Sequence, residues 1–102
     1  MHGRINMPAV VRQGDAGAVH CSGYTIATGS PDVLIDGRAV ARNGDSSSVH
    51  QKPSGNKCVP HVSQIIASGS TVFVNGLPVA VVGDRLGDCT QIIEGSESVF
   101  IG

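Results

Sequence analysis

Three side chains of metal-binding type occupy the same position in a pattern that occurs three times along the chain. The pattern includes a Gly-Asp dipeptide, found at Gly14-Asp15, Gly44-Asp45 and Gly83-Asp84. The residues five positions after these aspartates are His20, His50 and Cys89. Imidazole nitrogens and thiolate sulfurs are the usual ligands of zinc in proteins. If a threefold axis relates the copies, these three side chains meet at one point.

A zinc ion held by protein alone takes four ligands, and the middle repeat supplies a further histidine, His61. We therefore predict a closed site of three histidines and one cysteine, formed by His20, His50, His61 and Cys89. Such a site is typical of one structural Zn²⁺, with iron as the alternative metal. Cys21 and Cys58 are alternative sulfur ligands, although neither has a counterpart in the repeat. Cys58 is the more serious rival, because it lies in the same segment as His61 and could replace it or His50.

The same repetition argues against catalysis by the three aspartates. A catalytic group is needed once, so an aspartate in every copy indicates a turn residue that binds nearby backbone N–H groups. We give the same interpretation to the pairs Gly29-Ser30, Gly69-Ser70 and Gly95-Ser96. We therefore predict that the chain is not an enzyme. Two hypotheses compete with this one. A small zinc hydrolase would leave a coordination position for water, and a metal-binding module for sensing or storage would bind from an exposed site.

Apolar triplets that end in glycine predict the strands that position these residues. Together with the residues that close them, the three triplets read Val33-Leu34-Ile35-Asp36-Gly37, Val72-Phe73-Val74-Asn75-Gly76 and Val99-Phe100-Ile101-Gly102. Asp-Gly and Asn-Gly between apolar runs favour two-residue hairpin turns. The third copy stops at its turn, so we expect residues 8–12 to supply its returning strand and bring the two termini together.

The three hairpins predict an all-β fold, a small cone of pseudo-threefold repeats that is closed by pairing of the termini and stapled by a metal, with little or no helix. We take residues 1–102 as one domain with repeats at approximately 8–37, 38–76 and 77–102. Residues 46–62, rich in Ser, Pro, Gly and Lys, are expected to form a surface loop. Strand alternation leaves open whether Leu34, Phe73 and Phe100 face the core or the solvent.

Composition narrows the classes of partner. The net charge is −1 and the seven Lys and Arg residues are scattered, which argues against nucleic-acid binding. The N-terminal residues contain no apolar stretch that resembles a signal peptide, so we expect none, and no apolar run approaches the roughly 18 residues of a membrane span. Three cysteines without dense spacing predict reduced thiols and a cytoplasmic protein.

The residues ahead of each Gly-Asp resemble the Pro-Ala-Ala-Arg element of the PAAR-repeat proteins. The three versions are Ala9-Val10-Val11-Arg12, Ala39-Val40-Ala41-Arg42 and Pro78-Val79-Ala80-Val81. None matches perfectly and the third lacks the arginine, which puts in doubt any role assigned to the arginines. The surrounding pattern, with a metal ligand five residues after each Gly-Asp, covers nearly the whole chain.

The resemblance implies a cone with a zinc ion near its apex, held by three histidines and a cysteine. It also implies a structural role at the tip of a trimeric β-helical spike, the VgrG protein of the type VI secretion system. There the tip sharpens the spike for membrane puncture and recruits effector proteins. The alternative is the spike tip of a contractile bacteriophage tail. We therefore expect a monomer that caps a trimer, stays in the cytoplasm until assembly, meets the membrane only transiently and is translocated with the spike. Family members often carry extra N- or C-terminal domains, but because the first repeat begins about seven residues into the chain and the last ends at Gly102, we expect no toxin domain here.

Overall fold

The computed structural model describes residues 7–19, 21–67, 69–87 and 90–101, and within these ranges the chain forms only short antiparallel strands. The strands are Leu34–Ile35 (β1), Arg38–Ala39 (β2), His50–Ser54 (β3), Lys57–His61 (β4), Ile65–Ile66 (β5), Phe73–Val74 (β6), Leu77–Pro78 (β7), Arg85–Leu86 (β8) and Thr90–Gln91 (β9). They pair as β1–β2, β3–β4, β5–β8–β9 and β6–β7. These ranges contain no helix that could span a membrane. The all-β class is confirmed.

Two of the predicted hairpins form around their Asp-Gly and Asn-Gly turns. Asp36 and Asn75 both have φ of 55°, and the glycines that follow them have φ of 78° and 79°. Positive φ at both central residues is the signature of a type I′ turn, whose twist matches that of the flanking strands. The turns therefore give β1–β2 and β6–β7 the same shape.

The third hairpin is made from the two ends of the chain. Ala9 and Phe100 form an antiparallel bridge. The Val10 N–H donates to the carbonyl of Val99 at 3.0 Å, and the Ile101 N–H donates to the carbonyl of Pro8 at 3.1 Å. The corresponding bonds of the other two hairpins, from Val40 to Val33 and from Val79 to Val72, are also 3.0 Å long. The predicted closure is confirmed.

A closed ring of three backbone hydrogen bonds joins the repeats at their axis. The N–H of Val11 donates to the carbonyl of Ala80, that of Ala80 to Ala41, and that of Ala41 to Val11, at 2.9, 3.0 and 2.9 Å. The three side chains are 0 % exposed. Small residues are needed here because the three backbones approach one another closely. The ring fixes the repeats around a pseudo-threefold axis.

Two apolar clusters form the core, and the larger one includes the three residues of this ring. The larger contains Val11, Tyr24, Ile26, Ala41, Ile65, Ala67, Ala80, Leu86 and Ile92. The smaller consists of Val10, Val40 and Val79, one residue from each repeat. The short strands therefore form a core of two thin layers of mostly small side chains. The ring of Tyr24 is the one aromatic ring in these two clusters.

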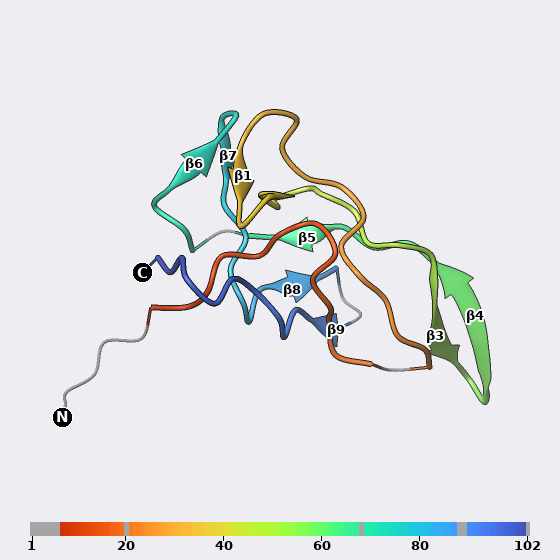
Figure 1. Cartoon of the computed structure of the whole chain (residues 1–102). Helices are drawn as coiled ribbons and strands as arrows, with labels where there is room; N and C mark the ends of the chain where they lie inside the picture. The colour runs from red at the N-terminus through yellow and green to blue at the C-terminus, as the bar shows by residue number, and fades with distance from the viewer. Residues whose placement is uncertain (1–6, 20, 68, 88–89, 102) are drawn as a thin grey trace, which may run out of the picture.

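The expectation of a surface loop at residues 46–62 is wrong for most of that segment. Residues 50–61 form β3–β4, the longest hairpin in the described part of the chain, with a turn at Gly55-Asn56 where Gly55 has φ of 64°. Its polar composition and its prolines conceal the strands. Proline is tolerated because this hairpin pairs with no other strand of the four sheets. Figure 1 shows it at the end of the molecule opposite β1 and β6.

Candidate metal centre and docking base

Two of the four predicted metal ligands face each other at the open end of the β3–β4 hairpin. His50 begins β3 and His61 ends β4, and the two residues are directly paired in the antiparallel register. Their Nε2 atoms lie 2.8 Å apart, and their ring planes are inclined by 63°. His50 is 3 % exposed. The hairpin therefore brings two imidazole nitrogens together at one partly buried point.

The environment of His50 orients its ring as in a metal ligand. Its Nδ1 lies 2.9 Å from the carbonyl oxygen of Ser48, and only an N–H can make that contact. The lone pair of the neutral ring then resides on Nε2, the atom that faces His61. Tyr24 stacks on the His50 ring, with centroids 4.4 Å apart, and its hydroxyl donates to the carbonyl of Gln91. Ligand histidines are commonly fixed by such contacts of the second ring nitrogen.

The other two predicted ligands, His20 and Cys89, lie outside the described residues. Within the described ranges no cluster of three or more His, Cys, Asp or Glu side chains suits a metal ion. His50 and His61 fit two of the three nitrogen ligands of the predicted zinc site. The Ser48 carbonyl binds Nδ1 of His50 and so leaves its Nε2 as an acceptor. The full ligand set stays a prediction.

The expectation of reduced thiols is wrong for two of the three cysteines. Cys21 and Cys58 form a disulfide with a Cα–Cα distance of 5.8 Å, which closes a separation of 37 positions. Cys58 is paired across the hairpin with Pro53, three positions along β4 from His61. Both its bond to Cys21 and its position toward the hairpin turn argue against Cys58 as the alternative sulfur ligand.

At the other end of the molecule, the most exposed large apolar side chain of each hairpin occupies the same position, and Val33, Val72 and Leu77 are exposed to a smaller extent. Leu34, Phe73 and Phe100 occupy equivalent positions and are 62 %, 59 % and 45 % exposed. The alternate side chains Ile35, Val74, Val99 and Ile101 pack on the smaller core cluster. This answers the question of strand orientation that the sequence left open. We call Leu34, Phe73 and Phe100 the docking base.

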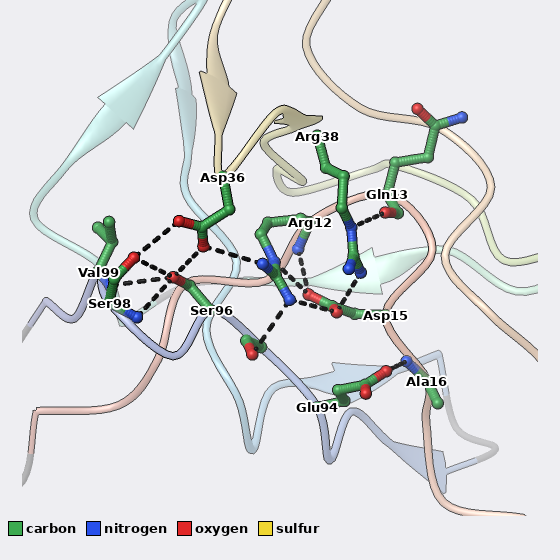
Figure 2. Close-up of polar contacts among 11 residues, drawn as sticks. Arg12, Gln13, Asp15, Ala16, Asp36, Arg38, Glu94, Ser96, Ser98 and Val99 are labelled. Carbon is green, nitrogen blue, oxygen red and sulfur yellow. Dashed lines mark hydrogen bonds and ion pairs between the residues drawn. The ribbon is translucent and has the colours of Figure 1, made fainter.

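The arginine of the first repeat ties its own turn to the neighbouring hairpin. Figure 2 shows Arg12 between Asp15 and Asp36. Its Nε and Nη2 donate to the two carboxylate oxygens of buried Asp15 at 3.0 and 2.9 Å, and its Nη1 donates to Asp36 at 2.9 Å. The hydroxyls of Ser96 and Ser98 also donate to Asp36. These bonds, chiefly those from the serines, lower the pKa of the Asp36 carboxyl.

The second repeat reproduces this arrangement with Arg42. Its Nε and Nη2 donate to Asp45 at 3.0 and 3.1 Å, and its Nη1 donates to the side-chain oxygen of Asn75 at 2.9 Å. Burial opposes ionisation of Asp45, but hydrogen bonds from Arg42 and Thr28 outweigh it, so the pKa of Asp45 is lowered. Arginine thus links each of these repeats to the turn of the next hairpin.

The third repeat keeps the aspartate and lacks the arginine. The N–H of Val81 donates to Asp84 at 2.8 Å, as the N–H groups of Arg12 and Arg42 donate to Asp15 and Asp45. Burial raises the pKa of the Asp84 carboxyl, and this backbone bond offsets only part of the effect. The interpretation of the aspartates as turn residues is confirmed in all three copies.

The sequence analysis missed the partners of Arg12 and Arg42, the ring stacking of Tyr24 and the disulfide. A signal existed for the arginines, since each precedes a repeat aspartate by three positions and each contacts a hairpin-turn Asp or Asn. Spacing gives no comparable signal for the disulfide, because its cysteines have no counterparts in the repeat.

Comparison with known families agrees with the repeat architecture. The family model described as the PAAR motif matches residues 56–102. The same hairpin and Gly-Asp geometry continues through the first repeats, as the bonds of Arg12 and Arg42 show. Over residues 56–102 the chain is therefore similar to the PAAR-repeat proteins. Proteins with this motif are structural spike tips of type VI secretion and phage-like systems. A search of curated proteins finds no match.

Proposed function

We propose that the chain caps and sharpens a trimeric, VgrG-like spike of a type VI secretion system. The observation that carries this proposal is the docking base. It has three large apolar side chains at equivalent positions around a pseudo-threefold axis. A single chain with this symmetry matches the end of a trimer, because each subunit meets a similar face. Exposed apolar side chains in such an arrangement are typical of a protein–protein interface.

The metal centre would stiffen the opposite end. His50 and His61, joined by His20 and Cys89, would hold one Zn²⁺, which when bound supplies a cross-link between segments far apart in the chain. The role would be structural, because four protein ligands leave no coordination position for water. The tip would stay in the cytoplasm until it is assembled and then leave the cell with the spike and any effector.

The docking proposal is tested by placing charge on the base. Leu34→Glu, Phe73→Glu and Phe100→Glu together should abolish a one-tip-to-one-trimer complex with a trimeric VgrG-like spike protein, measured by size-exclusion chromatography with light scattering. The charges would be desolvated at the interface, which costs several kcal/mol. The matched control is Ile66→Glu on β5, also an exposed apolar residue but outside the three hairpins.

The control variant should bind the spike with the same stoichiometry as the unmodified chain. If the triple variant also binds it unchanged, while circular dichroism shows all proteins folded, the base is not the docking surface and the proposal fails.

A further inference from the structure

The arginines of the first two repeats occupy equivalent spaces, which we call arginine slots. Each slot lies between a Gly-Ser turn and the Gly-Asp turn of another repeat. In one slot the Nη2 of Arg12 donates to the carbonyl of Gly95 at 3.3 Å, and in the other the Nη2 of Arg42 donates to that of Gly29 at 3.3 Å. In both, the same guanidinium also binds the repeat aspartate. A slot therefore recognises a guanidinium by a carboxylate and a backbone carbonyl.

The third slot holds Val81 in place of arginine and contains a cavity of about 70 Å³. Its lining residues are Pro8, Gly69, Ser70, Thr71, Val81 and Ile101.

The walls of the third slot are more open than those of the other two. A Cβ atom added at Gly29 or Gly95 would lie within 2.9 Å of neighbouring atoms, whereas one at Gly69 would meet nothing within 4 Å. Ser30 and Ser96 are buried at 4 % and 2 % exposure, and Ser70 is only half-buried. The Gly-Ser turn of this slot is therefore reachable from outside.

The acidic partner of the missing arginine is still present. Asp84 accepts the same backbone bond as Asp15 and Asp45, which holds its carboxylate beside residue 81. In the parts of the chain that the structure covers, no Arg or Lys forms an ion pair with it, and the adjacent Arg85 is exposed. Partial burial of this carboxylate without a cation raises its pKa.

We propose that the third slot receives the guanidinium of an arginine side chain from the protein that covers the docking base. The proposal rests on the proposed function for the position of that protein. Ile101 lines the slot beside Phe100, and Thr71 lines it two residues before Phe73, so a protein seated on the base reaches its mouth. A guanidinium fits better than an ammonium, because both filled slots use the planar fork of arginine to bind the carboxylate at two nitrogens.

The experiment titrates the ¹⁵N-labelled full chain with methylguanidinium chloride and follows the backbone amides by NMR. We expect saturable shifts at Gly69, Ser70 and Val81, with no comparable shifts at Arg12 or Arg42, whose slots are filled. Urea has the same planar shape without the charge, and sodium chloride controls for ionic strength, so neither should reproduce the shifts.

Two variants provide the critical comparison. Val81→Arg places the guanidinium in cis, so it should raise the thermal midpoint and remove the methylguanidinium response. Asp84→Asn keeps the backbone acceptor without the charge, so it should weaken the response at least tenfold. Shifts that persist in either variant, or that urea reproduces, would overturn the proposal. Because the titration uses no spike protein, its failure leaves the docking of the base unaffected, and a failed docking test leaves this result interpretable.

Discussion

The two imidazoles at the open end of β3–β4 illustrate how a residue's role depends on its second contact. His50 is fixed by a carbonyl at Nδ1 and by the Tyr24 ring, and this leaves Nε2 for His61 or for a metal. A histidine without such contacts would sample several rotamers and bind an ion more weakly.

Replacing His50 or His61 by alanine should remove most of the bound zinc from a chain that otherwise carries about one Zn²⁺. Stability should fall by several kcal/mol, because binding of a structural metal contributes directly to folding. Elemental analysis and thermal unfolding measure the two effects, and His2→Ala serves as the matched histidine control. Full metal content in both variants, or a native chain purified without metal, would refute the site.

Asp45 and Asp84 occupy the same repeat position and should respond to pH with opposite sign. The lowered pKa of Asp45 means that its contribution is present above the ordinary carboxyl pKa and is lost as the pH falls through the lowered value. The raised pKa of Asp84 means that stability falls as the pH rises from the ordinary value through the raised one.

At neutral pH, Asp45→Asn should destabilise the chain by about 1–3 kcal/mol, whereas Asp84→Asn should leave it equally stable or more stable. The difference for Asp84→Asn should shrink as the pH falls to the ordinary carboxyl pKa, whereas the difference for Asp45→Asn should shrink only below that value, as the pH falls through the lowered pKa. Denaturant unfolding across this range provides the measurement. A destabilising effect of Asp84→Asn that grows with pH would contradict the assignment.

At the scale of elements, the disulfide attaches the β3–β4 hairpin to the segment that carries His20. The hairpin pairs with no other strand of the four sheets, so this covalent bond supplements the contacts of its base. The double variant Cys21→Ser with Cys58→Ser should lose about 3–4 kcal/mol of stability, as expected for a closed loop of this length, and should retain its metal. Reduction of the unmodified chain should give the same loss. Loss of zinc in the double variant would show that one of these sulfurs is a ligand.

Short sequence motifs predicted the elements whose conformation is determined by residues close together in the chain. The turns at Asp36-Gly37 and Asn75-Gly76 follow from residues that tolerate positive φ, and the strands on either side needed only alternating apolar residues. The β3–β4 hairpin was missed because its strands carry proline, serine and lysine, although Gly55-Asn56 is itself a recognised turn signal.

The candidate site was predictable only in part, because its contacts join distant residues. His50 and His61, which the predicted ligand set brings together, have Nε2 atoms 2.8 Å apart, whereas the contact of Arg12 with Asp36 spans 24 positions and connects two different hairpins. Pairing of Cys21 with Cys58 depends on how the segment at Cys21 approaches strand β4 in space, and an odd cysteine count pointed the other way.

For the whole molecule, equivalence of the three hairpins predicts that any one of them can carry the chain ends. A circular permutant would join Ile101 to Pro8 through Asp-Gly, omit residues 1–7 and 102, and open the chain between Asp36 and Gly37. It should fold with a thermal midpoint close to that of the parent, because the new break falls in an exposed turn. Circular dichroism and metal content measure this. A second permutant, opened between Val40 and Ala41 in the axial ring, should fail to fold, and equal stability of the two would contradict the closure.

The ring of hydrogen bonds around the axis also makes mechanical strength depend on direction. A force that pulls the two termini apart acts first on the hairpin formed by the two chain ends. The few hydrogen bonds of this hairpin then break one after another. Thrust along the axis compresses the ring formed through Val11, Ala41 and Ala80, and its three bonds then share the load simultaneously. Such a body resists being driven forward far better than being pulled apart from its ends.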